Sequence, residues 1–270
     1  MTFNDFIPPI LKKVILKFRP QREGLYGWFG NYTTWEDAQK ECTGYDNSIL
    51  LEKIVLASKL VRDGKAKYER DSCIFEHIEY SWPILAGLLN ASVDGNLSIV
   101  DFGGSLGSSY YQNKHFFSTI HVKWAVVEQS SFVAIGKQEF TTKNLQFYNK
   151  IEDALAIQPK QVLLLSSVIQ YLANPKDWIE LFLSFDFPYI LIDRTSFINT
   201  ENDRITIQRV PPSIYEASYP CTFFNEEIFV SKFLPKYELI ASFPSYCDAE
   251  TVADDWKRLY WKGFIFKLKD

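Results

Sequence analysis

The chain has 270 residues, of which 47% are hydrophobic and 23% charged, a composition typical of a globular protein with a substantial core. Its formal net charge of −4 argues against a nucleic-acid partner, because such binders usually carry a basic excess. No apolar run approaches the roughly 18 residues that a membrane-spanning helix needs. We therefore expect a cytoplasmic protein with one large domain, or one domain and an extension.

A basic, apolar segment near the N-terminus reads IPPILKKVILKFRP. Lys12 and Lys13 interrupt its apolar run and no small-residue cleavage site follows, so we do not expect a signal peptide. The spacing of its apolar residues predicts an amphipathic helix that docks on its own domain. The alternative is a helix lying on an anionic membrane surface, which would make the protein peripheral to the inner membrane.

The cysteines and histidines do not form a metal-binding pattern. The four cysteines are far apart, no Cys-x-x-Cys pair occurs, and the three histidines do not cluster with them. We therefore expect no metal site and four free thiols, as is usual in a reducing cytosol.

Residues 1–92 show the patterns of helices. Thr34 precedes Asp37 by three residues, a weak form of the capping box that starts a helix. Apolar residues recur at helical spacing over 48–62 and again over 73–90, where Pro83 is expected to kink or restart the helix. This part predicts a helical cap joined to the rest of the protein.

Residues 93–270 show a different pattern, in which short apolar runs alternate with helical segments. Continuous apolar runs such as LSIV and VLLL are typical of strands covered by helices on both faces. The alternation predicts an α/β fold with a Rossmann-like, doubly wound, mostly parallel seven-stranded sheet. The last two strands have no helix between them, which predicts an antiparallel edge. The predicted strands are 98–101, 124–127, 145–148, 161–166, 189–193, 238–243 and 261–268. The predicted helices are 107–116, 131–140, 151–157, 176–185 and 225–234.

The turn after the first predicted strand lies in VDFGGSLGSSYYQ. In doubly wound sheets the ligand binds at the C-terminal ends of the strands, where the strand order reverses. The dinucleotide fingerprint fails because Phe102 stands where its first glycine should be, and the Walker pattern fails because no lysine follows Gly107. What fits is D-x-G-x-G-x-G with its middle glycine replaced, formed by Asp101, Gly103, Ser105 and Gly107.

This motif resembles the first motif of the class I S-adenosylmethionine-dependent methyltransferases. The resemblance implies S-adenosylmethionine as cofactor, a molecule with an amino-acid end, a sulfonium cation, a ribose and an adenine but no phosphate. The glycine turn would pass close under this cofactor, and Asp101 would bind its ammonium group. Glu128 ends the next strand, about twenty residues beyond the turn, where an acid accepts hydrogen bonds from both ribose hydroxyls. The alternatives are a glycine turn without a ligand and a solvated acid at a helix start.

The other cofactor residues follow the later strands. Asn149 or Asp153, after the third strand, would reach the adenine amine, although Asn149 is equally suited to cap a helix. Ser166 and Ser167, after the fourth strand, would meet the amino-acid end. The expected cofactor residues are Asp101, Gly103, Gly104, Ser105, Gly107, Glu128, Gln129, Asn149, Ser166 and Ser167.

Longer strings resemble one family of methyltransferases found among bacterial surface-polysaccharide biosynthesis genes. They are GNYTTWEDAQKECTGYD, YERDSCIFEHIEYSWPILAGLL, VDFGGSLGSSYYQ, LLLSSVIQYLANP, LIDRTSF and IYEASYPCTFFNEEIF. The match covers nearly the whole chain from about Tyr26 onward. By genomic association, the resemblance implies a methyl acceptor on a sugar or glycan precursor.

A sugar hydroxyl is a poor nucleophile at neutral pH, so its methylation requires a general base. His77 is one candidate, because histidine titrates near neutral pH, and a packed or surface histidine is the alternative. Asp193, at the end of the fifth predicted strand, is another candidate. Arg194 beside it would bind a phosphate or carboxylate of the acceptor, and an internal Asp–Arg ion pair is the alternative for both.

Further side chains are expected to contact the acceptor. Gln170 and Tyr171 would face the reaction cleft after the fourth strand. Tyr215, Tyr219 and Phe223 would form an aromatic lid suited to a sugar ring, and packing against the sheet is the alternative for them.

Three other functions are partly compatible with the sequence. A catalytically degenerate methyltransferase fold would serve as a binding module, but the retained Asp101, Gly103, Gly107 and Glu128 argue against it. A small-molecule O- or N-methyltransferase unrelated to glycans would share the cofactor site. A nucleotide-dependent oxidoreductase is disfavoured by the missing first glycine and by the lack of a suitably placed Y-x-x-x-K pair.

Overall fold

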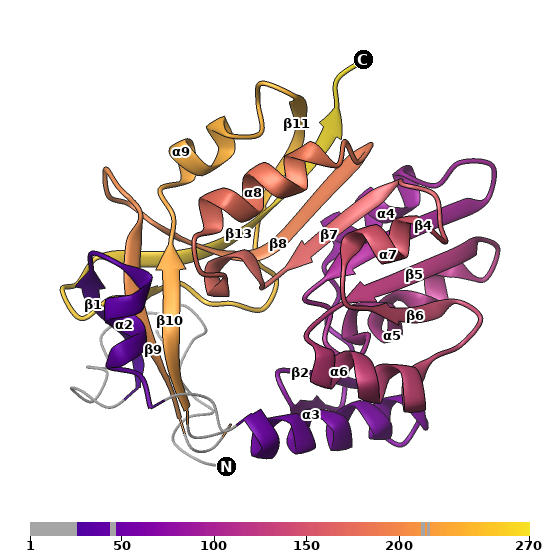
Figure 1. The fold of residues 1–270 in the computed structure, drawn as a ribbon, viewed down its shortest axis with the longest axis horizontal. Helices are drawn as coiled ribbons and strands as arrows, with labels where there is room; N and C mark the ends of the chain where they lie inside the picture. The colour runs from indigo at the N-terminus through magenta and orange to yellow at the C-terminus, as the bar shows by residue number, and fades with distance from the viewer. Residues whose placement is uncertain (1–25, 44–46, 212–213, 215–216) are drawn as a thin grey trace, which may run out of the picture.

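A central eight-stranded sheet forms the body of the molecule (Figure 1). The computed structural model describes residues 26–43, 47–211, 214 and 217–270. Seven strands lie in the order β11-β13-β8-β7-β4-β5-β6, and β12 pairs with β13 outside this path. Neighbours from β6 to β8 run parallel, whereas β13 is antiparallel to both β8 and β11. These strands are β4 (Asn96–Phe102), β5 (His121–Val127), β6 (Leu145–Tyr148), β7 (Val162–Ser166), β8 (Tyr189–Ile198), β11 (Tyr237–Pro244), β12 (Thr251–Val252) and β13 (Arg258–Leu268).

The predicted α/β fold is confirmed, with all seven predicted strands and the antiparallel edge. After β4 the chain adds β5 and β6 on one side of that strand and then crosses over to add β7 and β8 on the other side. Strand order therefore reverses between β4 and β7, as in a Rossmann-like sheet. The five predicted helices also form. They are α5 (Ser108–Asn113), α6 (Ser130–Ile135), α7 (Ile151–Leu155), α8 (Pro175–Ser184) and α9 (Glu226–Ser231).

The sheet is covered on both faces, which explains its continuous apolar strands. Successive strand residues point to opposite faces and enter two different apolar clusters. Ile99 and Leu164 pack with residues of α3 (Asn47–Arg62), α4 (Trp82–Asn90), α5 and α6. Val100 and Leu163 pack with residues of α7, α8 and α9. Burying both sets removes apolar surface from water on each side of the sheet, which is the dominant stabilising term.

The expectation that residues 1–92 are helical is wrong in part. β1 (Gly27–Tyr32) is a strand that pairs antiparallel with β9 (Arg204–Val210), and β9 pairs with β10 (Ala217–Phe223). A second, three-stranded sheet therefore combines strands from both sides of the predicted boundary at residue 92. The predicted cap at Thr34 is confirmed, since its hydroxyl accepts the Asp37 N–H at 3.2 Å and starts α2 (Trp35–Lys40).

The stretch 73–90 is also not one helix. β2 (Tyr68–Arg70) and β3 (Cys73–Phe75) form a hairpin, joined by Asp71 and Ser72 with φ of 52° and 67°. Two consecutive positive φ values define the tight turn that suits a two-residue hairpin loop. The helix α4 begins only at Trp82, with Pro83 in its first turn, so the proline starts the helix instead of kinking it.

The small sheet is tied to the central one. The Ile198 N–H at the end of β8 donates to the Phe224 carbonyl at 3.0 Å, just past β10. Arg204 on β9 donates to the Gly30 carbonyl on β1 at 2.7 Å, and also pairs with Asp254 and Asp255 at 2.8 Å each. These contacts bring β1, β9 and the loop before β13 together.

The amphipathic helix predicted near the N-terminus lies outside the described residues. Within the described part of the chain, no helix combines the length and the apolar character needed to traverse a lipid bilayer.

Candidate functional site

A large cavity lies at the C-terminal ends of the parallel strands, where the strand order reverses. Its volume is about 1140 Å³. One end is lined by the turn after β4 and the ends of β5 and β7, and we call it the glycine-turn end. The other end lies against the small sheet, and we call it the aromatic end. The aromatic end is lined by Trp28, Trp35, Tyr171, Tyr219 and Trp261.

The glycine turn is built from left-handed backbone. Gly103 has φ +74°, and a Cβ placed there would lie 2.5 Å from Val168 Cγ2. A Cβ on Gly104 would lie 2.5 Å from the Asp101 carboxylate, so the turn is packed against that acid. Ser105 adopts φ 54°, which is the conformation that a glycine in the replaced position would supply. The serine therefore preserves the shape of the turn.

Gly107 has a different place from the other glycines of the motif. It precedes α5 with φ +90°, and a Cβ there would approach Leu145 Cδ2 to 2.9 Å. It is not among the residues that line the cavity. Its role in the structure is close packing between the helix start and β6.

Two acids lie beside this turn. Asp101 is almost fully buried, accepts the Trp124 indole N–H at 2.9 Å, and has a pKa raised by burial from 3.8 to about 7. Glu128 accepts the Gln129 N–H at 2.6 Å and is also bonded by the Ser105 N–H of the glycine turn. Burial raises the pKa of Glu128 as well. The motif acid and the acid of the next strand thus meet at one end of the cavity, as the sequence predicts.

Other predicted residues complete this end of the cavity. Gln129, Asn149, Ser166 and Ser167 all line it. Asn149 does not cap α7, whose cap residue is Lys150, and its amide instead donates to the Ser130 hydroxyl at 3.2 Å. The alternative residue for the adenine, Asp153, is exposed and lies outside the cavity lining, so Asn149 is the better placed of the two.

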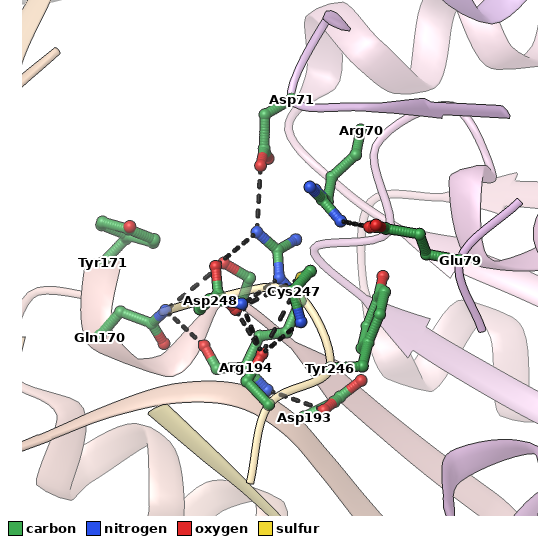
Figure 2. Close-up of polar contacts among 12 residues, drawn as sticks. Arg70, Asp71, Glu79, Gln170, Tyr171, Asp193, Arg194, Tyr246, Cys247 and Asp248 are labelled. Carbon is green, nitrogen blue, oxygen red and sulfur yellow. Dashed lines mark hydrogen bonds and ion pairs between the residues drawn. The ribbon is translucent and has the colours of Figure 1, made fainter. Parts of the chain in front are cut away.

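Asp193 and Arg194 also line the cavity. Figure 2 shows their side chains and polar contacts. They form a bulge in β8 opposite Gly263, where the register with β13 shifts and Arg194 has φ 52°. Asp193 is buried, which raises its pKa to about 6, and its carboxylate accepts the Arg194 backbone N–H at 3.0 Å. The bulge aims both side chains at the cavity.

The Arg194 guanidinium pairs with acids other than its neighbour. It donates to Asp248 at 3.0 Å and 3.3 Å, and to Asp71 on the hairpin turn at 3.0 Å (Figure 2). We call these three side chains the Arg194 cluster. Its cation is already offset by two carboxylates. The cluster joins β8, the β2–β3 hairpin and the loop after β11.

Two of the predicted contact residues lie elsewhere. Gln170 does not face the cleft, because it is fully buried and its amide donates to the Arg194 carbonyl at 2.9 Å, which supports the bulge. His77 is exposed in the loop between β3 and α4 and does not line the cavity. The helix expected around His77 does not form, so its predicted position over the site is wrong.

The predicted aromatic lid is only partly present at the aromatic end. Tyr219 lines the cavity and its ring lies edge-on to Tyr171 at 5.4 Å, while the Tyr171 hydroxyl donates to Gln208 at 2.9 Å. Phe223 packs in the interior against Trp28, at 5.8 Å between rings, so its assignment to a lid is wrong. Tyr215 lies outside the described residues.

A buried acid on the cap completes the cavity, and the sequence analysis missed it. Glu69 on β2 lines the cavity and accepts a hydrogen bond from the Ser108 hydroxyl at the start of α5. It is 4% exposed, and burial raises its pKa to about 7. A three-residue strand has no periodicity to reveal it, so only the folded hairpin shows that Glu69 faces the site. In the described residues, no group of three or more His, Cys, Asp and Glu side chains is arranged to hold a metal ion.

Comparison with solved structures finds similar chains among methyltransferases. An S-adenosylmethionine-dependent methyltransferase from Clostridium acetobutylicum ATCC 824 is 10% identical, with a TM-score of 0.44 over 69% of this chain and 89% of that one. An S-adenosylmethionine-dependent methyltransferase from Aquifex aeolicus is 13% identical, with a TM-score of 0.46 over 84% of this chain and 100% of that one. The glycopeptide N-methyltransferase MtfA, crystallised with S-adenosylmethionine, is 11% identical, with a TM-score of 0.44 over 67% of this chain and 92% of that one.

No protein-family model matches the chain, and no curated protein matches it. At such low identities the structural likeness concerns the fold alone. Function has to be inferred from the residues of this chain.

Proposed function

We propose that this protein is an S-adenosylmethionine-dependent methyltransferase. The observation that carries the proposal is the meeting of the glycine turn with Glu128 at the switch point of the sheet, on one wall of a cavity. The residues present fit a phosphate-free nucleoside. Glu128 would offer carboxylate oxygens to ribose hydroxyls, and the turn presents bare backbone at Gly103 and Gly104, which line the cavity and have no room for a Cβ beside Val168 and Asp101. Among the described residues that line the cavity there is no lysine, and the two arginines are engaged by acids, Arg70 by Glu79 and Arg194 by Asp71 and Asp248.

The chain's own residues would bind, orient and shield the cofactor. Glu128 would hold the ribose, Asn149 and Gln129 the base, and Asp101 with Ser166 and Ser167 the amino-acid end. When bound, the cofactor supplies a methyl group on a sulfonium, which is a good leaving group. The protein has to align the acceptor with that methyl group and exclude water, and a deep cavity between two sheets would serve both tasks.

We further propose that the acceptor is a hydroxyl of a sugar or glycan precursor, bound at the aromatic end. Five aromatic side chains line this end, and the amides of Gln39 and Gln208 lie among them. Aromatic faces with nearby amide groups suit a sugar ring, whose C–H face is apolar and whose edge carries hydroxyls. Asp193 is placed to bond an acceptor hydroxyl.

Calorimetric titration with S-adenosylmethionine tests the cofactor assignment. The wild-type chain should bind it, and Glu128→Ala should weaken binding about 10- to 100-fold, the loss expected for hydrogen bonds to a charged group. Glu152→Ala removes an exposed acid of α7 outside the cavity and should leave affinity unchanged. Undiminished affinity in E128A would place the ribose elsewhere. Absence of binding by the wild type at high micromolar concentration would favour a binding module over an enzyme.

Methyl uptake tests the acceptor assignment. The wild-type chain, supplied with methyl-labelled S-adenosylmethionine, would be assayed against nucleotide sugars and lipid-linked sugars. Labelled sugar is the expected product. Labelling of a non-sugar small molecule instead would retain the enzyme and overturn the glycan assignment.

A further inference from the structure

Glu69 is the acid that the cap contributes to the cavity. It lies on β2, opposite the glycine turn, and the Ser108 hydroxyl that bonds it belongs to the first residue of α5, directly after that turn. The Ser72 backbone N–H also bonds it. These two donors fix the carboxyl where the cap meets the turn. Glu69 thus lines the cavity beside the end of the glycine turn.

No cation is paired with Glu69 among the ion pairs of the described residues. Asp71 lies two residues further on and repels a negative charge on Glu69. Arg194 attracts it weakly, but the Arg194 guanidinium is bonded to Asp71 and Asp248. A buried carboxyl without its own cation is costly to ionise and is rarely retained for stability. It takes up and releases a proton close to neutral pH, which is what a base for a hydroxyl has to do.

The other acids in the cavity are less free to act as a base. Asp101 is held by Trp124 and packed beneath Gly104 on the cofactor side of the turn. Asp193 accepts its neighbour's backbone N–H and lies against a guanidinium, which stabilises its charged form and weakens it as a base. His77, the base expected from the sequence, lies outside the cavity.

We propose that Glu69 is the general base that deprotonates the acceptor hydroxyl, an inference that rests on the proposed function. The hydroxyl proton passes to the Glu69 carboxylate as the acceptor oxygen forms a bond to the methyl carbon. The bond from that carbon to sulfur breaks, and its electron pair stays on sulfur, giving the neutral thioether S-adenosylhomocysteine. A base has to lie within hydrogen-bond distance of the acceptor oxygen, on the side of the methyl group away from sulfur, so its charge would act on the sulfonium cation across the acceptor.

This placement can be tested before the acceptor is known. A carboxylate facing the sulfonium favours S-adenosylmethionine over the uncharged product. At pH 8, Glu69→Gln should lower the calorimetric affinity for S-adenosylmethionine about tenfold and that for S-adenosylhomocysteine less than about twofold. Glu76→Gln makes the same change at an exposed residue outside the cavity and should alter neither affinity. Retained binding of S-adenosylhomocysteine shows that E69Q is folded.

The outcomes separate the two proposals. If the wild type binds neither compound, the proposed function fails, and the role of Glu69 fails with it. If the wild type binds both and E69Q keeps the wild-type ratio of affinities, Glu69 is not at the transfer point. If E69Q does not fold, Glu69→Asp provides the test, because it keeps the charge. It should retain the wild-type ratio of the affinities for S-adenosylmethionine and S-adenosylhomocysteine, and loss of that ratio would overturn the proposal.

Turnover on an acceptor methylated by the wild type gives a second readout. E69Q should lower kcat at least about 100-fold with little change in KM, and should remove the low-pH limb of the kcat profile. Normal turnover by E69Q would overturn the proposal.

Discussion

Asp101 combines a structural cost with the binding role proposed for it. It is buried beneath the turn, with a tryptophan N–H as its hydrogen-bond donor and no cationic partner among the described residues. Burial disfavours its charged form, which is the form needed to attract an ammonium group. An ammonium group bound beside this acid would help to ionise it, so stability and binding oppose each other at this residue.

Asp101→Asn should change how stability depends on pH. The pKa of Asp101 is about 7 when folded and near 3.8 when unfolded, so between these values the folded chain holds a proton that the unfolded chain releases. The free energy of unfolding therefore falls as pH rises through this window. D101N lacks that decline. From pH 4 to pH 8, the free energy of unfolding of D101N should therefore rise relative to that of the wild type by more than about 1 kcal/mol. Denaturant titrations across pH measure this. Parallel curves for the two proteins would contradict the burial argument.

The glycine turn shows how one element constrains both fold and site. The left-handed Gly103 brings the backbone close to Val168, on the segment after β7, and Gly104 brings it close to Asp101. The same conformation keeps Cβ atoms out of the cavity. The turn is thus a single rigid support for the two strands on either side of the switch point.

Gly103→Ala should destabilise this element. A non-glycine residue at φ +74° costs about 1–2 kcal/mol, and the added Cβ also meets Val168 at 2.5 Å. Denaturant unfolding should show a loss above that range and a weaker affinity for S-adenosylmethionine. In a Val168→Ala background the 2.5 Å contact with Cγ2 is removed, whereas the 2.9 Å contact with the Cβ of residue 168 and the backbone strain stay, so the same substitution should cost less there. An equal loss of free energy of unfolding in both backgrounds would show that the contact with Val168 Cγ2 does not contribute to that loss.

The elements differ in how well the sequence predicts them. The central strands are apolar on both faces and separated by amphipathic helices, so their identity and order are predictable, as are the glycine turn and Glu128. β1 is not, because Gly27 and Gly30 have positive φ and a bulge breaks its alternation. Its strand character comes from pairing with β9, almost two hundred residues away. Glu69 depends likewise on a short hairpin fixed by tertiary contacts.

At the scale of the molecule, the Arg194 cluster connects the cap to the central sheet. Arg194 reaches from β8 to Asp71 on the hairpin and to Asp248 after β11, with side-chain exposures of 12%, 56% and 22%. The β2 hairpin also carries Glu69, so the same cluster helps to hold that acid against the glycine turn.

Arg194→Met should destabilise the whole protein and loosen the hairpin. Removing the cation leaves Asp248 partly buried without a cationic partner, which should cost about 2–3 kcal/mol, below the roughly 3–5 kcal/mol of fully buried pairs because Asp248 keeps 22% of its side-chain exposure. Arg258→Met removes an exposed pair with Glu250 and should cost less than about 1 kcal/mol. Denaturant unfolding gives both values, and hydrogen exchange should be faster at β2 and β3 in R194M. Equal costs for the two variants would show that the Arg194 cluster adds no stability.

The β9–β10 excursion departs from the end of β8 and returns to it, and the Ile198–Phe224 hydrogen bond closes its base at 3.0 Å. Segments with adjacent ends can be exchanged with little loss of chain entropy. Replacing this one segment would thus change the aromatic end of the cavity while the glycine-turn end stays intact. The replacement has to keep a strand that pairs with β1, as β9 does, because β1 would otherwise lose this partner in the small sheet.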